Sequence, residues 1–215
     1  MFPSRWSRGL LHGSRLPLAS TLVALPTLVL AVTAQSAPVS KNLQYKCNFP
    51  LMQPQPLTLR IQSDIPTSVQ AGTSTQAFPV QAEADVSANA AKGLVGLESA
   101  TIEGSAAATA NLLLPGGTTF AAKVNTTIAK ANIPTTGAFT TSATGATPPL
   151  TFDDPGTAVI KLGDLVLTLR PRLADGTLTG LNEFETECTL AAGQDATFAT
   201  IQVIEAFPLL PNGKL

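Results

Sequence analysis

Residues 182–190, Asn-Glu-Phe-Glu-Thr-Glu-Cys-Thr-Leu, alternate between acidic residues and residues suited to a buried face. Alternation with a period of two residues is typical of a β-strand that buries one face and exposes the other. The buried face would carry Phe184, Thr186 and Cys188, and the exposed face Glu183, Glu185 and Glu187. The segment therefore predicts a strand that buries a cysteine and presents a row of carboxylates to solvent.

The same alternation recurs along most of the chain. The expected inward rows are Leu57, Leu59 and Ile61; Val80, Ala82, Ala84 and Val86; Phe120, Ala122, Val124, Thr126 and Ile128; Leu165, Leu167 and Leu169; and Ala199, Ile201 and Val203. Turn-forming residues separate these rows, at 114–117 (Leu-Pro-Gly-Gly), 163–164 (Gly-Asp) and 175–176 (Asp-Gly). The spacing around Gly163-Asp164 predicts a tight β-hairpin. An alanine-rich run predicts one short helix near residues 88–92.

This pattern predicts an all-β fold. We expect a single immunoglobulin-like β-sandwich of roughly eight to ten antiparallel strands over residues 42–206, because two packed sheets bury such rows between them. Residues 35–41 would form a flexible lead-in, and residues 207–215 a C-terminal tail. No linker divides residues 42–206, so one domain is expected.

The first 34 residues have the charge order of a secretory signal peptide. Three arginines precede an apolar stretch at residues 16–32, and Val-Thr-Ala at 32–34 satisfies the small-residue rule for cleavage before Gln35. The alternative is a retained membrane anchor. Pro26 disfavours the anchor, because it would remove a helical hydrogen bond. We therefore expect a secreted protein, located outside the cell or in the periplasm or cell envelope.

Cleavage would change the chemistry of the mature chain. It would remove three of the 13 basic residues and none of the 14 acidic ones, so the formal charge would change from −1 to −4. Such a chain lacks the positive surface that nucleic acid or an anionic membrane requires. Loss of His12, the only histidine, excludes a Ser-His-Asp triad and histidine-based metal sites. We expect no catalytic residues, no cofactor, no metal ligands and no membrane insertion after signal cleavage.

Cys47 and Cys188 are the only cysteines. An exported chain passes through a compartment in which thiols oxidise, so we expect one disulfide between them. Each lies on the inward face of an alternating segment, and the bridge would join the first strand to one of the last. The alternatives are two buried free thiols or an intermolecular bridge.

Four segments together carry a family resemblance: Tyr-Lys-Cys-Asn-Phe-Pro-Leu (45–51), Ala-Phe-Pro-Val (77–80), Pro-Gly-Thr (155–157) leading to Gly-Asp-Leu (163–165), and Phe-Glu-Thr-Glu-Cys (184–188). Over residues 43–205 the chain resembles a family of secreted bacterial domains, frequent in actinomycetes, with immunoglobulin-like sandwich character and unknown function. The resemblance implies export, that fold and the Cys47–Cys188 pairing, and it transfers no activity. Antibody-type hallmarks are missing, since no tryptophan lies between the cysteines and Thr186 stands where a tyrosine would precede Cys188.

The acidic residues suggest two alternative sites. Calcium needs six to eight oxygens from converging directions, which a straight row at 183–187 supplies only if Asp153 and Asp154 fold nearby. Paired carboxylates could also hydrolyse a glycoside. That function generally needs aromatic rings to hold the sugar, and the mature chain would have no tryptophan. The simplest interpretation of the acidic row is a solvated strand face. The simplest interpretation of the separated charges Lys161, Arg170 and Arg172 is that they contribute to solubility.

We therefore expect a secreted, non-catalytic β-sandwich module with a structural, adhesive or protein-interaction role at the cell envelope or outside the cell. Its partner would be an unidentified protein or cell-surface component. The alternative is a calcium- or ligand-binding module, followed by a carboxylate-dependent hydrolase.

Overall fold

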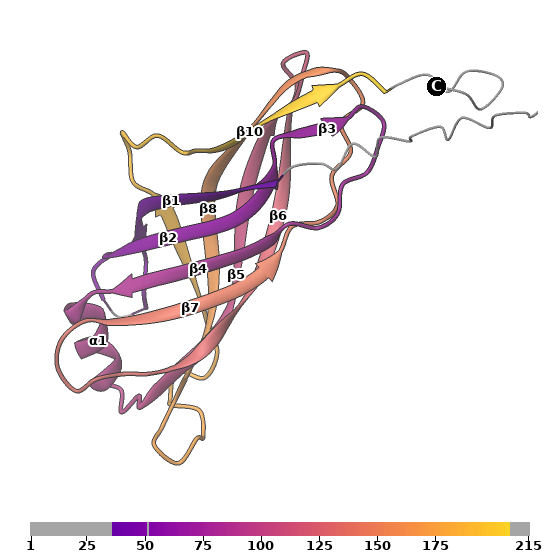
Figure 1. Ribbon diagram of the computed structural model, residues 1–215. Helices are drawn as coiled ribbons and strands as arrows, with labels where there is room; N and C mark the ends of the chain where they lie inside the picture. The colour runs from indigo at the N-terminus through magenta and orange to yellow at the C-terminus, as the bar shows by residue number, and fades with distance from the viewer. Residues whose placement is uncertain (1–35, 51, 207–215) are drawn as a thin grey trace, which may run out of the picture. The chain divides into compact units, whose positions relative to one another are not determined.

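The computed structural model describes residues 36–50 and 52–206, which form strands and one short helix (Figure 1). The elements are β1 (Ser36–Cys47), β2 (Gln55–Pro66), β3 (Ser68–Gln70), β4 (Pro79–Val86), α1 (Ala88–Val95), β5 (Thr101–Leu113), β6 (Thr119–Asn132), β7 (Phe139–Ala146), β8 (Gly156–Arg172), β9 (Phe184–Leu190) and β10 (Thr197–Ile204). The expected signal peptide, its cleavage position and the tail at 207–215 lie outside the described residues. Residues 36–41, expected as part of a flexible lead-in, instead belong to β1.

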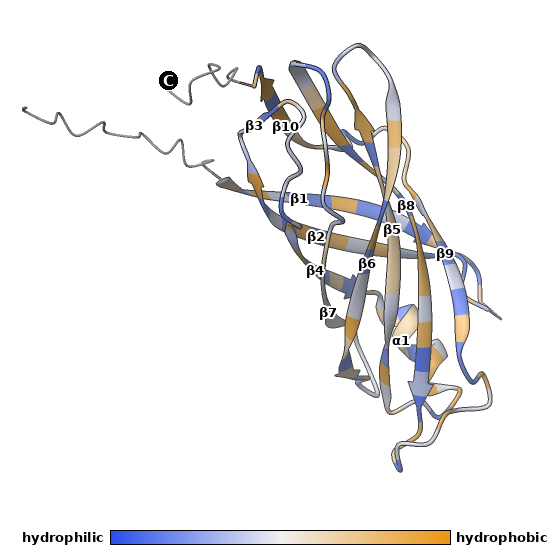
Figure 2. Cartoon of the chain, turned by 90° about the vertical axis from the view of Figure 1, so that its right-hand side faces the viewer, coloured by the Kyte–Doolittle hydropathy of each residue, from blue (hydrophilic) through white to orange (hydrophobic). Residues whose placement is uncertain are grey.

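Eight of the strands close into an antiparallel barrel. Their order is β8-β5-β6-β7-β4-β2-β1-β9, and β9 pairs again with β8, which completes the ring. The prediction of an all-β fold is confirmed, but the immunoglobulin-like sandwich is wrong, because a sandwich has two separate sheets. Period-2 rows show that one strand face is buried, and this holds equally for a sandwich and for a barrel. Figure 2 shows hydrophobic and hydrophilic residues alternating along the strands of the ring.

β8 is the longest strand and replaces the predicted Gly163-Asp164 hairpin. It runs without a turn from Gly156 to Arg172. Residues 156–161 pair with β10, and residues 165–169 pair with β9, so the strand changes partner around Gly163. Opposite this point, the β5–β8 register shifts between Ala108 and Ala110. Gly163 therefore marks an irregularity within a strand. A glycine between two apolar runs commonly indicates either such an irregularity or a hairpin turn.

The turns predicted at 114–117 and 175–176 are present. The amide of Leu114 donates to Thr118 across the first, at 2.8 Å, and the amide of Leu173 donates to Thr177 across the second, at 2.8 Å. Most of the predicted inward rows are buried, except that Phe120 is exposed. At that end of β6 only β5 lies beside the strand, since β7 pairs with β6 only from residue 125 onward.

The two ends of the barrel are filled differently. At one end α1 packs Ala90, Ala91 and Leu94 into the apolar interior, and the hydroxyl of its N-cap residue Ser87 accepts the amide of Ala90 at 3.2 Å. This hydrogen bond satisfies one free amide of the first turn and sets where the helix begins. The predicted short helix is thus confirmed and extends to Val95. At the other end Phe78, Leu150, Phe152 and Phe198 form a second apolar cluster, with β10 and β3 attached beside it.

Candidate functional site

The barrel encloses an apolar cavity of about 150 Å³. Aliphatic residues from β2, β4, β5, β6 and β8 form most of its wall, and four phenylalanines also line it, Phe49, Phe78, Phe139 and Phe198. The cavity is similar in size to an engineered cavity of about 150 Å³ that stays dry and binds benzene or xenon. None of its described lining residues carries an acidic or basic side chain. The space therefore suits an apolar molecule or an apolar part of a larger one.

Several hydroxyl side chains line the cavity, and two of them, Tyr45 and Ser63, are buried. Tyr45 is 3% exposed, and its hydroxyl donates to the carbonyl oxygen of Gly163 at 3.1 Å. Burial, with a smaller contribution from the charge of Asp164, raises the pKa of Tyr45 to about 12, so the phenol stays neutral. Ser63 is 7% exposed, and its Oγ has no hydrogen-bond partner in the described structure. A buried hydroxyl without a partner is costly, so a polar atom of a ligand would stabilise it.

Ser63 is distinctive among the buried hydroxyl groups. Four such groups lack a partner in the described part of the chain: Ser63, Ser99, Thr179 and Thr186. Of these four, only Ser63 lines the cavity. It follows Leu57, Leu59 and Ile61 on the inward face of β2, at a position where the period predicts an apolar residue. That break in the row is the sequence signal that could have identified it.

A polar groove of about 660 Å³ lies on the barrel wall where β6 and β7 separate. It shares four lining residues with the cavity, Ala82, Thr141, Ser142 and Ala143. The cavity and the groove are therefore neighbours across this part of the wall.

The β6–β7 ladder is short. Only residues 125–128 of β6 pair with residues 146–143 of β7. Within this ladder the backbones approach closely, since a Cβ atom at Gly145 would lie 2.2 Å from the carbonyl oxygen of Asn125. Beyond it the strands diverge toward the connecting residues 133–138 (Figure 1). In that part the hydroxyl of Thr141 donates to the carbonyl of Ala129 at 3.4 Å, which is a long hydrogen bond.

The β1–β9 ladder is also short, with three residue pairs, but it is reinforced. Cys47 and Cys188 face each other in it and form the predicted disulfide. The side chain of Gln194 bonds both backbone groups of Gln44, each at 2.8 Å. The β1–β9 junction is thus held by a covalent bond, whereas the β6–β7 ladder, which is also short, has no such bond.

An ion pair also joins β1 to the segment between β9 and β10. The amine of Lys41 donates to Asp195 at 2.8 Å. This hydrogen bond, with those from Thr197, holds the pKa of Asp195 well below its usual range.

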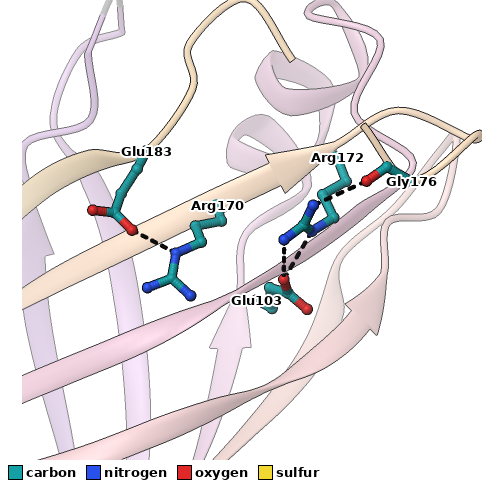
Figure 3. A network of polar contacts seen from close by, with 5 residues as sticks. All are labelled: Glu103, Arg170, Arg172, Gly176 and Glu183. Atoms are coloured by element: carbon teal, nitrogen blue, oxygen red, sulfur yellow. Dashed lines mark hydrogen bonds and ion pairs between the residues drawn. The ribbon is translucent and has the colours of Figure 1, made fainter. Parts of the chain in front are cut away.

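The two arginines near the end of β8, Arg170 and Arg172, form ion pairs within the chain (Figure 3). Arg170 binds Glu183, while Arg172 binds Glu103 at 2.7 Å and donates to the carbonyl of Gly176 at 2.9 Å. Lys161 is exposed on β8, on the other side of Gly163 from both arginines.

The candidate calcium ligands are far apart. Asp153 and Asp154 precede the first residue of β8, whereas Glu187 pairs with Val166 near the other half of that strand. About 12 residues of strand, at about 3.3 Å each, separate the two groups along β8. Across the described residues, no three His, Cys, Asp or Glu side chains are placed to hold a metal ion. No helix in the same ranges is long and apolar enough to cross a membrane.

Comparison with known proteins gives a family but no activity. No curated protein matches the chain. The model of a family described as "Family of unknown function (DUF6801)" matches residues 44–199, close to the span over which the sequence resembles a domain of unknown function. Because this match covers well over half of the 215 residues, the chain belongs to that family of unknown function.

Proposed function

We propose that this domain is an exported, non-catalytic binding protein that holds a small apolar ligand inside its barrel. The observation that carries the proposal is the apolar cavity of about 150 Å³ inside the barrel, with no charged side chain among its described lining residues. Ligand sites in proteins are commonly apolar spaces with a few polar groups that fix orientation. The export part of the proposal rests on the N-terminal charge order, and the disulfide is consistent with it.

The lining of the cavity favours binding over catalysis. General acid–base chemistry needs a group whose pKa lies near the working pH. The one ionisable group among the described lining residues is Tyr45, whose pKa of about 12 keeps its proton in place. A carboxylate-dependent hydrolase would need two acids at the ligand, and the described acidic residues line no part of this cavity. Binding is therefore the function that the cavity supports best.

Toluene is a suitable probe, because its size matches the cavity and it has no polar group. We expect it to shift the methyl NMR signals of Leu59, Ile128 and Leu167, which line the cavity from three strands. It should also raise the melting temperature, since a ligand that binds only the folded state stabilises that state.

Two matched substitutions test the location. Ala84→Leu places extra carbons at the cavity wall and should abolish the toluene shifts. Ala121→Leu makes the same change at an exposed position on β6 and should leave them intact. Absence of methyl shifts in the wild-type protein up to the solubility limit of toluene would refute the proposed function.

A further inference from the structure

The place where the cavity meets the groove is also the least supported part of the barrel wall. The two shortest ladders of the ring are β1–β9 with three residue pairs and β6–β7 with four. The first is crossed by a disulfide, whereas the unpaired part of the second is crossed by one long hydrogen bond between side chain and backbone. Separation of Thr141 from Ala129 would cost little, because a partly exposed hydroxyl regains a bond to water. A ligand that entered here would displace packed side chains such as Ile133 and Phe139 but would break no β6–β7 ladder pair.

The cavity and the groove differ in polarity, and together they form one site with two kinds of lining. The cavity is apolar, and the groove is bordered by hydroxyl, amide and charged side chains. A molecule that fills both must have an apolar chain at one end and a polar group at the other. A purely apolar ligand would leave the groove to water.

The charges of the groove decide the sign of that polar group. Its charged lining residues are Arg60, Glu83 and Lys130, which carry a net charge of +1. Arg60 and Glu83 lie 3.9 Å apart and partly compensate each other. Lys130 is exposed on β6 and forms no ion pair or hydrogen bond within the described ranges. An anionic group placed in the groove would give Lys130 a partner.

Building on the proposed function, we propose that the ligand is a single-chain amphiphile with a carboxylate head. Its chain lies in the cavity, passes between β6 and β7 beside Thr141 and Ser142, and places the carboxylate near Lys130. Roughly six carbons match a cavity that would hold benzene. Octanoate is therefore the probe, because about six of its carbons fill the cavity and the two that remain, one of them the carboxylate carbon, place the head at the wall beside the groove. Its uncharged counterpart of the same chain length is 1-octanol.

The test compares two charge reversals on the same strand. Lys130→Glu should weaken octanoate binding about tenfold, since one attraction is lost and one repulsion is gained at an exposed site. The affinity of the Lys130→Glu variant for 1-octanol should stay within about twofold of the wild-type value. Lys123→Glu changes the net charge by the same amount at an exposed position of β6 outside the groove, and should alter neither affinity. Equal losses of octanoate affinity in both variants, or an equal loss for 1-octanol in Lys130→Glu, would overturn the proposal.

NMR shifts locate the two ends of the probe. With octanoate, we expect cavity methyl signals to move together with the amide signals of residues 129–132 and 139–144. With toluene, we expect the methyl signals alone to move. Amide shifts elsewhere on the barrel, without those of the β6–β7 groove, would refute this route into the cavity. If toluene binds and octanoate does not, the inferred ligand class is wrong while the cavity remains a binding site, so the two failures are distinguishable.

Discussion

Replacement of both bridged cysteines, Cys47→Ala with Cys188→Ala, should lower the free energy of unfolding by about 3 to 5 kcal/mol. The bridge closes a loop of 141 residues, for which the loss of unfolded-state entropy corresponds to about 5 kcal/mol at 25 °C. That figure is an upper value, because residual structure in the unfolded chain reduces it. It is large beside the roughly 5–15 kcal/mol that stabilises a typical domain.

Urea unfolding followed by circular dichroism measures this change. With a slope of about 2 kcal/mol per molar urea, the midpoint should fall by roughly 2 M. Wild-type protein with its disulfide reduced is the matched control, because it lacks the constraint but keeps the sequence, and it should lose a similar amount. A change below about 1 kcal/mol in both samples would refute the entropic argument.

The structure also predicts which part of the barrel loses stability when the disulfide is removed. The β1–β9 ladder has three residue pairs, so without the bridge it should open locally before the barrel unfolds. Hydrogen exchange should therefore accelerate most at the amides of Asn48 and Ala191, which donate across this junction, at 2.9 Å each. Amides of the β5–β8 ladder, with 12 residue pairs, should still exchange through global unfolding. Uniform acceleration would show that the ladder closes firmly without the bridge.

Three further measurements test the burial of Tyr45, the β6–β7 ladder and the Lys41–Asp195 ion pair. Tyr45, the only tyrosine, should ionise at about pH 12 in an ultraviolet titration of the folded protein and near pH 10 in urea. Because unfolding releases its proton in this range, the free energy of unfolding should fall as the pH rises from about 10 to about 12. A titration midpoint near pH 10 in the folded protein would contradict its burial. Gly145→Ala should destabilise the protein by about 1 to 3 kcal/mol, since the new Cβ meets a backbone carbonyl, whereas Gly180→Ala, which enters open space, should change stability by less than about 0.5 kcal/mol in the same urea assay. Asp195→Asn should make thermal stability less sensitive to acid, because a carboxylate with a lowered folded-state pKa loses its contribution as pH falls below its unfolded value of about 3.9; an unchanged pH profile would show that the Lys41 ion pair is immaterial.

The sequence predicted the strands better than their arrangement. Rows such as Leu57 and Leu59 or Leu165 to Leu169 are inward as expected, because burial of alternate residues is a local property. Closure of the ring depends instead on which strands pair across long sequence separations, as β5 does with β8 and β1 does with β9. The pattern around Gly163 was misleading because a chain irregularity and a hairpin turn use the same residues.

The candidate site was harder to predict than the disulfide. Two cysteines in a chain that was expected to be exported leave few choices, so the Cys47–Cys188 pair could be named from composition. The cavity arises from the diameter of the ring and from small side chains such as Ala84 and Ala143, which the sequence cannot distinguish from ordinary strand residues. Ser63 carried a signal in the β2 row, but one serine among aliphatic residues gains meaning only when an empty space lies beside it.

Ring closure between β1 and β9 sets the order of events during synthesis. The first strand of the barrel pairs with β2 on one side and with residues 188–190 of β9 on the other. The barrel thus cannot complete its hydrogen bonding until these late residues have been made, and contacts over such separations slow folding. Until then the barrel has exposed strand edges. Formation of the Cys47–Cys188 disulfide would therefore mark the pairing of β9 with β1, which closes the ring.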